Sequence, residues 1–190
     1  MQGTSSEIIE ELFELGGSSG GARPKIFVAY NPGNEEIIHG EEELPKEFEN
    51  WIIKFPSSSD NPEIAKIVYA YHKMVTKAGI EMSVCKLFEG KSGKLYFGTK
   101  RFDRIGNTRL HVHTASGLMQ DNFRASTMDY GPLMDCAFRL ERHVNVYRKV
   151  LRLAAFNVFS HNRDDHSKNF SFLDISPFGG TCTFKSEGKS

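Results

Sequence analysis

A short polar segment at residues 162–169 most constrains what this chain can fold into and do. It places two carboxylates, an imidazole, an ammonium group and two carboxamides within eight residues, Asn-Arg-Asp-Asp-His-Ser-Lys-Asn. An apolar run with helical spacing precedes it, and the Phe-Ser-Phe-Leu run at 170–173 predicts a buried strand after it. A solvated loop is also polar, but it has no reason to alternate these chemical types at a helix-to-strand junction. We therefore interpret the segment as a catalytic or metal-holding loop.

Composition excludes several other classes of protein. A chain of 190 residues forms one substantial domain or two small lobes, because it buries roughly 70% of its unfolded surface. Lysine plus arginine equals aspartate plus glutamate at 24 each, so no overall basic field predicts direct nucleic-acid or membrane binding. No apolar run approaches the roughly 20 residues that cross a bilayer. An odd number of cysteines without a Cys-x-x-Cys pair indicates free thiols, and with no secretion signal we expect a cytoplasmic protein.

The order of predicted elements is strand-rich and then helix-rich. Helices are predicted at 5–15, 62–78 and 141–160, and strands at 26–30, 51–55, 82–88 and 94–101. Gly79 is the expected stop of the second helix, and residues 31–47 are expected to form a solvated loop or hairpin tip. In the third helix, the expected apolar stripe contains Val146, Val150, Ala154 and Val158. We predict an α+β fold, divided into residues 1–105 and 106–190.

A Gly/Ser loop precedes the first long strand. Four glycines in residues 16–21 allow a tight turn whose N–H groups bind a phosphate, and Lys25 adds a charge nearby. The spacing differs from a Walker loop, and such a loop alone is more often a flexible connector. The strand that follows it and a lysine on the next strand favour the phosphate-binding interpretation.

Lys54 is that lysine, within the apolar run Trp-Ile-Ile-Lys-Phe. Burying it unpaired costs free energy, so its ammonium group either reaches solvent or clamps a nucleotide phosphate, as the third-strand lysine of protein kinases does. Residues 100–104 are a charged strand end whose backbone would meet an adenine edge, with Asp103 near a ribose hydroxyl. Taken alone, an ordinary charged strand end is the preferred interpretation. His111 and His113 alternate along a possible strand, but no third metal ligand accompanies them.

Within the polar segment, Asp164 and Asn169 stand five apart, as do the base and the magnesium-binding asparagine of the kinase catalytic loop. Asp164 would accept the proton of an attacking hydroxyl, and Asn169 would bind magnesium. Lys168 would neutralise charge on the transferred phosphoryl group. Asp165 is the weaker base because it lies four residues from the asparagine, and His166 is expected to organise the loop by hydrogen bonding.

Taken together, four ordered motifs resemble the HipA family of bacterial serine/threonine kinases, toxins of type II toxin–antitoxin pairs. The motifs are Gly-Gly-Ser-Ser-Gly-Gly-Ala-Arg-Pro-Lys at 16–25, Lys54, Lys-Arg-Phe-Asp-Arg at 100–104, and the run from Asn162 to Leu173. The resemblance covers residues 12 to 174. It implies a two-lobed, protein-kinase-like fold with a strand-rich N-lobe, an incomplete helical C-lobe, and ATP and Mg²⁺ in the cleft.

The resemblance also implies the residues of the nucleotide site. The phosphate loop would contain Ser18, Ser19, Gly20, Gly21, Ala22 and Lys25. Lys54 would be the ATP lysine, Lys100 and Phe102 would form the adenine hinge, and Asp103 would lie near the ribose. His166 joins the nucleotide-binding residues, Asp164 and Lys168 the catalytic ones, and Asn169 the metal site. Ser18 occupies the position of the family's self-phosphorylated serine, whose phosphorylation would eject the loop and switch the kinase off.

Family membership further implies partners. Members phosphorylate aminoacyl-tRNA synthetases and are held by a DNA-binding antitoxin of the HipB type, so we expect a protein substrate and such an antitoxin. The sequence names neither, and it leaves the oligomeric state open.

The chain departs from the family pattern at three places. Val68 stands where the family has a helix glutamate, so Lys54 lacks its expected partner unless Glu63 replaces it. No aspartate follows Asp174, although the family's second magnesium ligand lies beyond the loop asparagine. Residues 175–190 do not resemble the family, and the large helical lobe and the N-terminal subdomain are missing, which suggests a truncated or frameshifted end.

Two alternatives to an active kinase follow. The first is a truncated or degenerate kinase-like module that binds nucleotide or antitoxin with little or no phosphoryl transfer. The second is a metal-dependent hydrolase that uses Asp164, Asp165 and His166, whose side chains are suitable ligands. The hydrolase leaves the Gly/Ser loop and Lys54 without a role.

Overall fold

A computed structural model describes residues 2–15, 23–39, 43–122, 128–174 and 182–186. The chain forms two compact units. The first contains Met1–Lys73 and Ser83–Arg109, and the second contains Met74–Met82 and Leu110–Ser190. The sequence placed the division between residues 105 and 106; in the structure the main change of unit follows Arg109, and residues 74–82 join the second unit.

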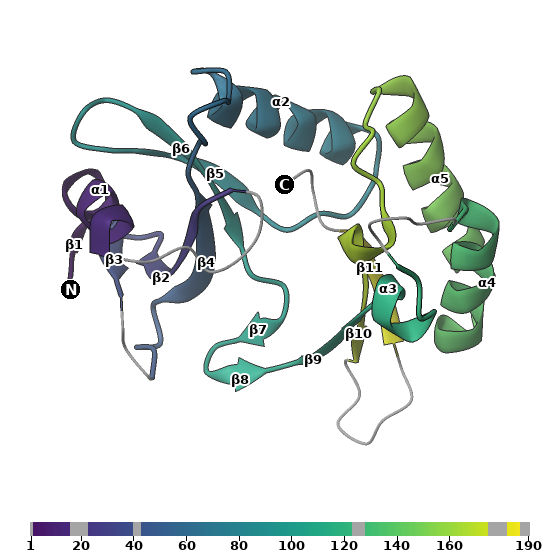
Figure 1. Cartoon of the computed structure of the whole chain (residues 1–190). Helices are drawn as coiled ribbons and strands as arrows, with labels where there is room; N and C mark the ends of the chain where they lie inside the picture. The colour runs from purple at the N-terminus through teal and green to yellow at the C-terminus, as the bar shows by residue number, and fades with distance from the viewer. Residues whose placement is uncertain (1, 16–22, 40–42, 123–127, 175–181, 187–190) are drawn as a thin grey trace. The chain divides into compact units, whose positions relative to one another are not determined.

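The first unit is built on a six-stranded sheet in which every neighbouring pair is antiparallel (Figure 1). Its strand order is β1-β3-β2-β4-β6-β5. The strands are β1 (Gln2–Thr4), β2 (Lys25–Asn31), β3 (Glu36–Ile38), β4 (Glu49–Lys54), β5 (Cys85–Glu89) and β6 (Leu95–Lys100). All four predicted strands are therefore confirmed, with β5 starting later than expected.

Two strands of this sheet, β1 and β3, were missed. β3 lies within 31–47, which was expected to be a solvated loop or hairpin tip, and Ile37 is fully buried there. Its three residues form a strand because they pair with β2 on one side and β1 on the other. Such short strands depend on partners distant in sequence, and a local pattern does not reveal them.

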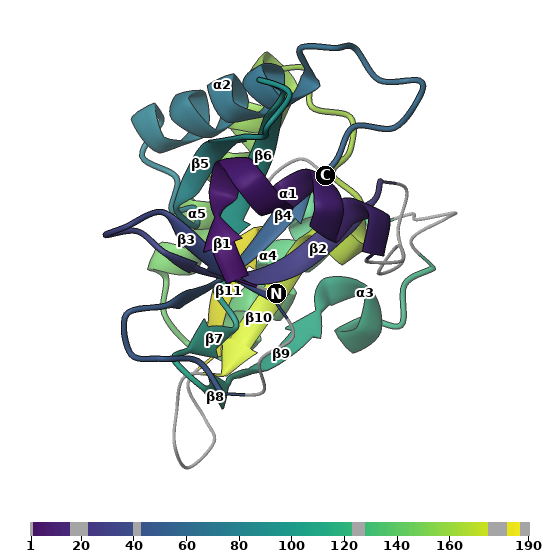
Figure 2. The same ribbon diagram turned by 90° about the vertical axis from the view of Figure 1, so that its left-hand side faces the viewer.

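Helices cover both faces of this sheet (Figures 1 and 2). Helix α1 (Ser5–Leu15) buries Ile8, Ile9 and Leu12 in a cluster that includes Tyr96 of β6. Helix α2 (Ile64–Lys77) buries Ala65 and Val68 against Phe97, the next residue of β6. Because successive strand residues point to opposite faces, α1 and α2 must lie on opposite sides of the sheet. Both predicted helices are confirmed.

After β6 the chain forms a small hairpin, β7 (Arg104–Ile105) and β8 (Thr108–Arg109). The second unit then contains a three-stranded antiparallel sheet in the order β11-β10-β9, from β9 (His111–Thr114), β10 (Phe170–Asp174) and β11 (Cys182–Ser186). The predicted buried strand after the polar loop is confirmed, since Phe170 to Leu173 are all buried.

Helices pack around this sheet. They are α3 (Ala115–Leu118), α4 (Tyr130–Glu141) and α5 (Asn145–Phe159). A core of Leu133 and Ala137 from α4, Val146 and Val150 from α5, and two strand phenylalanines joins the layers. No helix in the described part of the chain is long and apolar enough to cross a membrane.

The predicted helix at 141–160 was partly wrong. Its first residues belong to the end of α4, which stops where Arg142 adopts a left-handed φ of 52°. The buried face of α5 contains Val146, Val150, Leu153 and Asn157, whereas Val158 is 69% exposed. A strict step of four drifts around a helix of 3.6 residues per turn, so the buried face shifts to a step of three after Val150.

Candidate functional site

The polar segment predicted from sequence forms the loop between α5 and β10. Its start is fixed by the Asn162 N–H, which donates to the Asn157 carbonyl at 2.9 Å. Its end is a 3₁₀ turn, η2 (Ser167–Asn169), where the Asn169 N–H donates to the His166 carbonyl at 2.9 Å. The loop therefore lies between a helix with one buried face and a buried strand, and both hold its position.

Asp164, which precedes the turn, and Asn169, its last residue, are brought together. The Asn169 Nδ2 donates to the Asp164 carbonyl oxygen, and the Asp164 N–H donates to Asn162 Oδ1 at 3.3 Å. With its Nδ2 engaged by the backbone, Asn169 has Oδ1 as its cation-binding atom. His166 Nε2 lies 3.3 Å from Asp164 Oδ1, so the imidazole contacts the carboxylate within the loop, and its organising role stays a prediction.

Asp165 has a different environment from its neighbour. Its Oδ2 accepts the Tyr130 hydroxyl at 2.9 Å, and that hydroxyl oxygen accepts from Asn157 Nδ2 at 2.7 Å. Asn157 Oδ1 in turn accepts from Asn162 Nδ2 at 3.0 Å. Burial, followed by the hydrogen bond to Asp165, raises the pKa of Tyr130, so the phenol stays protonated and donates. Asp165 thus anchors the loop to α4 and α5.

Sequence reasoning missed Tyr130 and Asn157. Asn157 had a usable signal, because it is a carboxamide on the buried face of α5 and such a group needs hydrogen-bond partners. Tyr130 had none, because it stands 35 residues before Asp165 at the start of another helix.

Ser167 lies on the buried side of the turn and Lys168 on its exposed side. Ser167 is fully buried, and its hydroxyl donates to Asp121 Oδ2 in the segment after α3. Lys168 is exposed. The buried serine therefore holds the turn, while the lysine side chain is exposed to solvent.

In the first unit, the two lysines predicted to bind phosphate face each other across neighbouring strands. Lys25 of β2 is the register partner of Lys54 of β4, so both side chains leave the same face of the sheet. Phe97 is the partner of Lys54 on β6, which places this face on the side covered by α2. Residues 18–22 of the predicted phosphate loop lie outside the described residues.

The helix position where the resemblance expects a glutamate is apolar. Val68 is buried with Ala65, Cys85 and Phe97, and Glu63 pairs with Lys66 one turn along α2. Burial raises the pKa of the Cys85 thiol, while the charge of Lys54 opposes that change. The charge of Lys54 therefore reaches Cys85, which packs with Val68 in the apolar cluster.

Asp103 of the predicted ribose contact and Lys100 of the predicted adenine hinge both form ion pairs with neighbouring side chains. Asp103 accepts two bonds from Arg101, at 2.9 and 2.7 Å, and one from Arg104 at 2.6 Å. Burial opposes ionisation of Asp103, but the Arg101 hydrogen bonds together with the charges of Arg101 and Arg104 outweigh it and lower the pKa. Lys100 pairs with Glu49 at 2.7 Å. A ribose contact by Asp103 stays a prediction, and the carboxylate would be shared with two arginines.

A second ion pair fixes the chain just after the Gly/Ser loop. Arg23 Nε and Nη2 donate to the two Asp60 oxygens at 2.9 and 2.8 Å. Arg23 hydrogen bonding, aided by the Ser57 N–H, lowers the pKa of Asp60 to about 2. The entry to β2 is thus fastened to the segment that precedes α2.

Metal ligation by a side-chain cluster finds no support in the described residues, where no three His, Cys, Asp or Glu side chains are arranged to hold an ion. His111 and His113 lie on β9, both exposed, with ring centroids 6.4 Å apart. Asp165 points to Tyr130 rather than to a shared ion with Asp164. This geometry disfavours the hydrolase interpretation.

Comparison with known proteins identifies the fold. The HipA-like C-terminal domain family matches residues 17–183, which extends past 174, where the resemblance was expected to end. The structure of HipA from Shewanella oneidensis MR-1, in complex with HipB and operator DNA, has a TM-score of 0.62 at 19% identity and covers 87% of this chain. The Helicobacter pylori proinflammatory kinase CtkA has a TM-score of 0.54 at 16% identity and covers 90% of this chain.

This chain covers only 42% of that HipA chain and 55% of CtkA. A search of curated proteins gave no significant match. The two solved structures show a shared HipA-like, kinase-like fold at low identity. Because the family match spans most of the sequence, the chain belongs to the HipA-like C-terminal domain family.

Proposed function

We propose that this protein is an ATP-dependent serine/threonine protein kinase of the HipA type. The observation that carries the proposal is the loop at 162–169, where the Asn169 side chain donates to the Asp164 backbone carbonyl while the Asp165 carboxylate accepts from Tyr130. A base and a hard oxygen ligand in one loop are the two groups that a kinase catalytic loop supplies.

The proposed chemistry follows from these side chains. The hydroxyl of a serine or threonine substrate loses its proton to the Asp164 carboxylate as its oxygen bonds to the γ-phosphorus of ATP. The bond from that phosphorus to the bridging oxygen breaks, and ADP leaves with the electron pair. Lys168, exposed on the turn, offsets the negative charge of the transferred group.

The donor set suits Mg²⁺ bound with ATP. Asn169 Oδ1 is a hard oxygen ligand of the kind that Mg²⁺ prefers, while the Asp164 carboxylate takes the proton of the substrate hydroxyl. When bound, the ion would neutralise phosphate charge during transfer. Lys25 and Lys54, register partners on one sheet face, would hold the phosphates of the nucleotide.

The partners are proposed on the same grounds. The structural relative from Shewanella oneidensis MR-1 is bound to HipB and operator DNA, which supports a HipB-type antitoxin as a partner. A protein substrate, of which an aminoacyl-tRNA synthetase is the family example, is part of the proposal. Ser18 would be the self-phosphorylated serine.

A second function, a nucleotide-binding module with little phosphoryl transfer, has one specific observation in its favour. The helix position where the family places a glutamate is Val68, buried in an apolar cluster. A valine cannot supply the helix carboxylate that pairs with the phosphate-binding lysine of kinases.

Incubation with γ-labelled ATP and magnesium distinguishes the two functions. A kinase incorporates label at Ser18, and the label disappears in Ser18→Ala and in Asp164→Ala. A binding module takes up ATP in equilibrium dialysis, weakened by Lys54→Ala, with no label on any residue. Absence of ATP binding would exclude both functions.

A further inference from the structure

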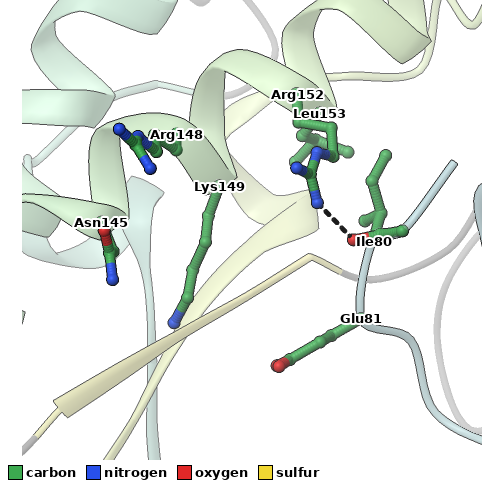
Figure 3. A pocket seen from close by; sticks show the side chains of 8 residues that line it. Ile80, Glu81, Asn145, Arg148, Lys149, Arg152 and Leu153 are labelled. Atoms are coloured by element: carbon green, nitrogen blue, oxygen red, sulfur yellow. Dashed lines mark hydrogen bonds between the residues drawn. The ribbon is translucent and has the colours of Figure 1, made fainter.

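A pocket of about 310 Å³ lies in the second unit (Figure 3), and none of its lining residues belongs to the loop at 162–169. One wall is the short segment Gly79–Glu81 that follows α2, and the other is the N-terminal half of α5. All of its lining residues belong to the same compact unit. Its volume falls at the lower end of the range for small-ligand sites, about 300–1,000 Å³.

The first wall is held rigidly. The N–H groups of Gly79 and Ile80 donate back to the Thr76 and Val75 carbonyls at 3.0 and 3.2 Å, which closes the end of α2. Gly79 has a left-handed φ of 71°. Arg152 then donates from Nη1 to the Gly79 carbonyl at 2.9 Å (Figure 3). The segment is therefore fastened to α5 before any ligand arrives.

The second wall is strongly cationic. Arg148, Lys149 and Arg152 extend from one face of α5, while Glu81 is the single carboxylate among the lining residues (Figure 3). Like charges three and four positions apart on a helix repel one another. Lys149 is partly compensated by Glu141 at 3.3 Å, and the lining keeps two more positive than negative charges.

Two further features select the ligand. Ile80 and Leu153 supply apolar surface to the pocket, and both also contact the core of the second unit. Asn145, the first residue of α5, lines the pocket, so the positive end of the helix dipole adds to the field there. An arginine fork binds phosphate oxygens in pairs, and a phosphate monoester carries nearly two negative charges at neutral pH.

We propose that this pocket binds a phosphate monoester whose organic part rests on Ile80 and Leu153. Arg148 and Arg152 contact the phosphate oxygens, Arg152 through the N–H groups not used on Gly79. Lys149, oriented by Glu141, adds a third charge. The ligand is either a small organophosphate or a phosphorylated side chain, which share this chemistry.

Binding is measured by calorimetry with phenyl phosphate and with a phosphoserine hexapeptide, at constant ionic strength. The Lys54→Ala protein is used throughout, so that the proposed nucleotide site makes little contribution. Saturable binding of either probe is expected, and the tighter one identifies the source of the phosphate. Arg148→Gln is expected to weaken binding about tenfold or more, which is about 1.4 kcal/mol, and it leaves the Arg152–Gly79 bond in place.

Arg139→Gln is the matched control, because Arg139 is an exposed arginine of α4 that does not line the pocket. It should bind as the parent protein does. Equal binding by the Arg148→Gln and parent proteins, or no saturable binding of either probe, would overturn the proposal. Neither result bears on ATP transfer by the loop at 162–169, so the two proposals fail independently.

Discussion

At the scale of single residues, the distinction between Asp164 and Asp165 rests on Tyr130. Its hydroxyl donates to Asp165 and accepts from Asn157, a side chain that is only 5% exposed. Tyr130→Phe therefore leaves the buried Asn157 amide without its acceptor and Asp165 without its donor. We expect a loss of about 1–3 kcal/mol in the free energy of unfolding, measured by urea titration.

Tyr147→Phe is the control for that substitution. Tyr147 is a half-buried tyrosine of α5 that stacks on Phe138, with ring centroids 5.2 Å apart, and the stacking survives removal of the hydroxyl. Its unfolding free energy should change by much less. Equal losses in the two variants would show that the Tyr130 hydroxyl does not anchor the loop.

The Arg23–Asp60 pair predicts a pH dependence. Hydrogen bonding by Arg23 lowers the pKa of Asp60 from 3.8 to about 2, so the folded state holds the carboxylate ionised more strongly than the unfolded chain does. This stabilisation is complete above the unfolded pKa and disappears as the pH falls through the folded one. Asp60→Asn should therefore melt below the wild type at neutral pH, with the difference shrinking between about pH 4 and pH 2. A difference in Tm that stays constant over this window would contradict the assignment.

At the scale of elements, the end of α2 depends on one glycine. Gly79 adopts a φ of 71°, and a Cβ there would lie 3.1 Å from Arg152 Nη1. Gly79→Ala is expected to cost about 1–2 kcal/mol of folding stability, because L-residues are strained in the left-handed region. Gly131→Ala in α4 is the comparison, since a Cβ there meets nothing within 4 Å. It should be neutral or slightly stabilising in thermal unfolding; a loss equal to that of Gly79→Ala would argue against backbone strain.

The elements also show what local sequence patterns determine. Helices α1 and α2 and the strands with long apolar runs were predicted, because periodicity and stop residues such as Gly79 are local signals. The short strands β1 and β3 were missed because pairing with distant strands creates them. The exposed face of α5 was misassigned because a step of four and the true helical repeat differ only slightly over a single turn.

In the candidate site, sequence reasoning found the loop itself but not its supports. Asp164, His166 and Asn169 were identified from residue types and spacing, and the structure joins them by short contacts. Tyr130, Asn157 and Asp121 hold the loop from other elements. Their roles depend on tertiary packing, and of the three only a buried carboxamide on a helix is visible in the sequence.

At the scale of the whole molecule, the lysines proposed to bind phosphate and the proposed catalytic loop belong to different compact units. Lys25 and Lys54 lie on the sheet of the first unit, and Asp164 and Asn169 lie in the second. The proposed kinase function therefore requires both units, and neither unit alone should transfer phosphate. The family match from 17 to 183 extends across both.

Single-turnover transfer of the γ-phosphoryl group from ATP tests the central claim most directly, by comparing Asp164→Asn with Asp165→Asn. Asparagine at 165 still accepts the Tyr130 hydroxyl bond, so this variant should keep most of the wild-type rate. Asparagine at 164 cannot take a proton, and the rate should fall about 10²–10⁴-fold. Wild-type transfer by Asp164→Asn, or an equal collapse in both variants, would contradict the assignment of Asp164 as the base.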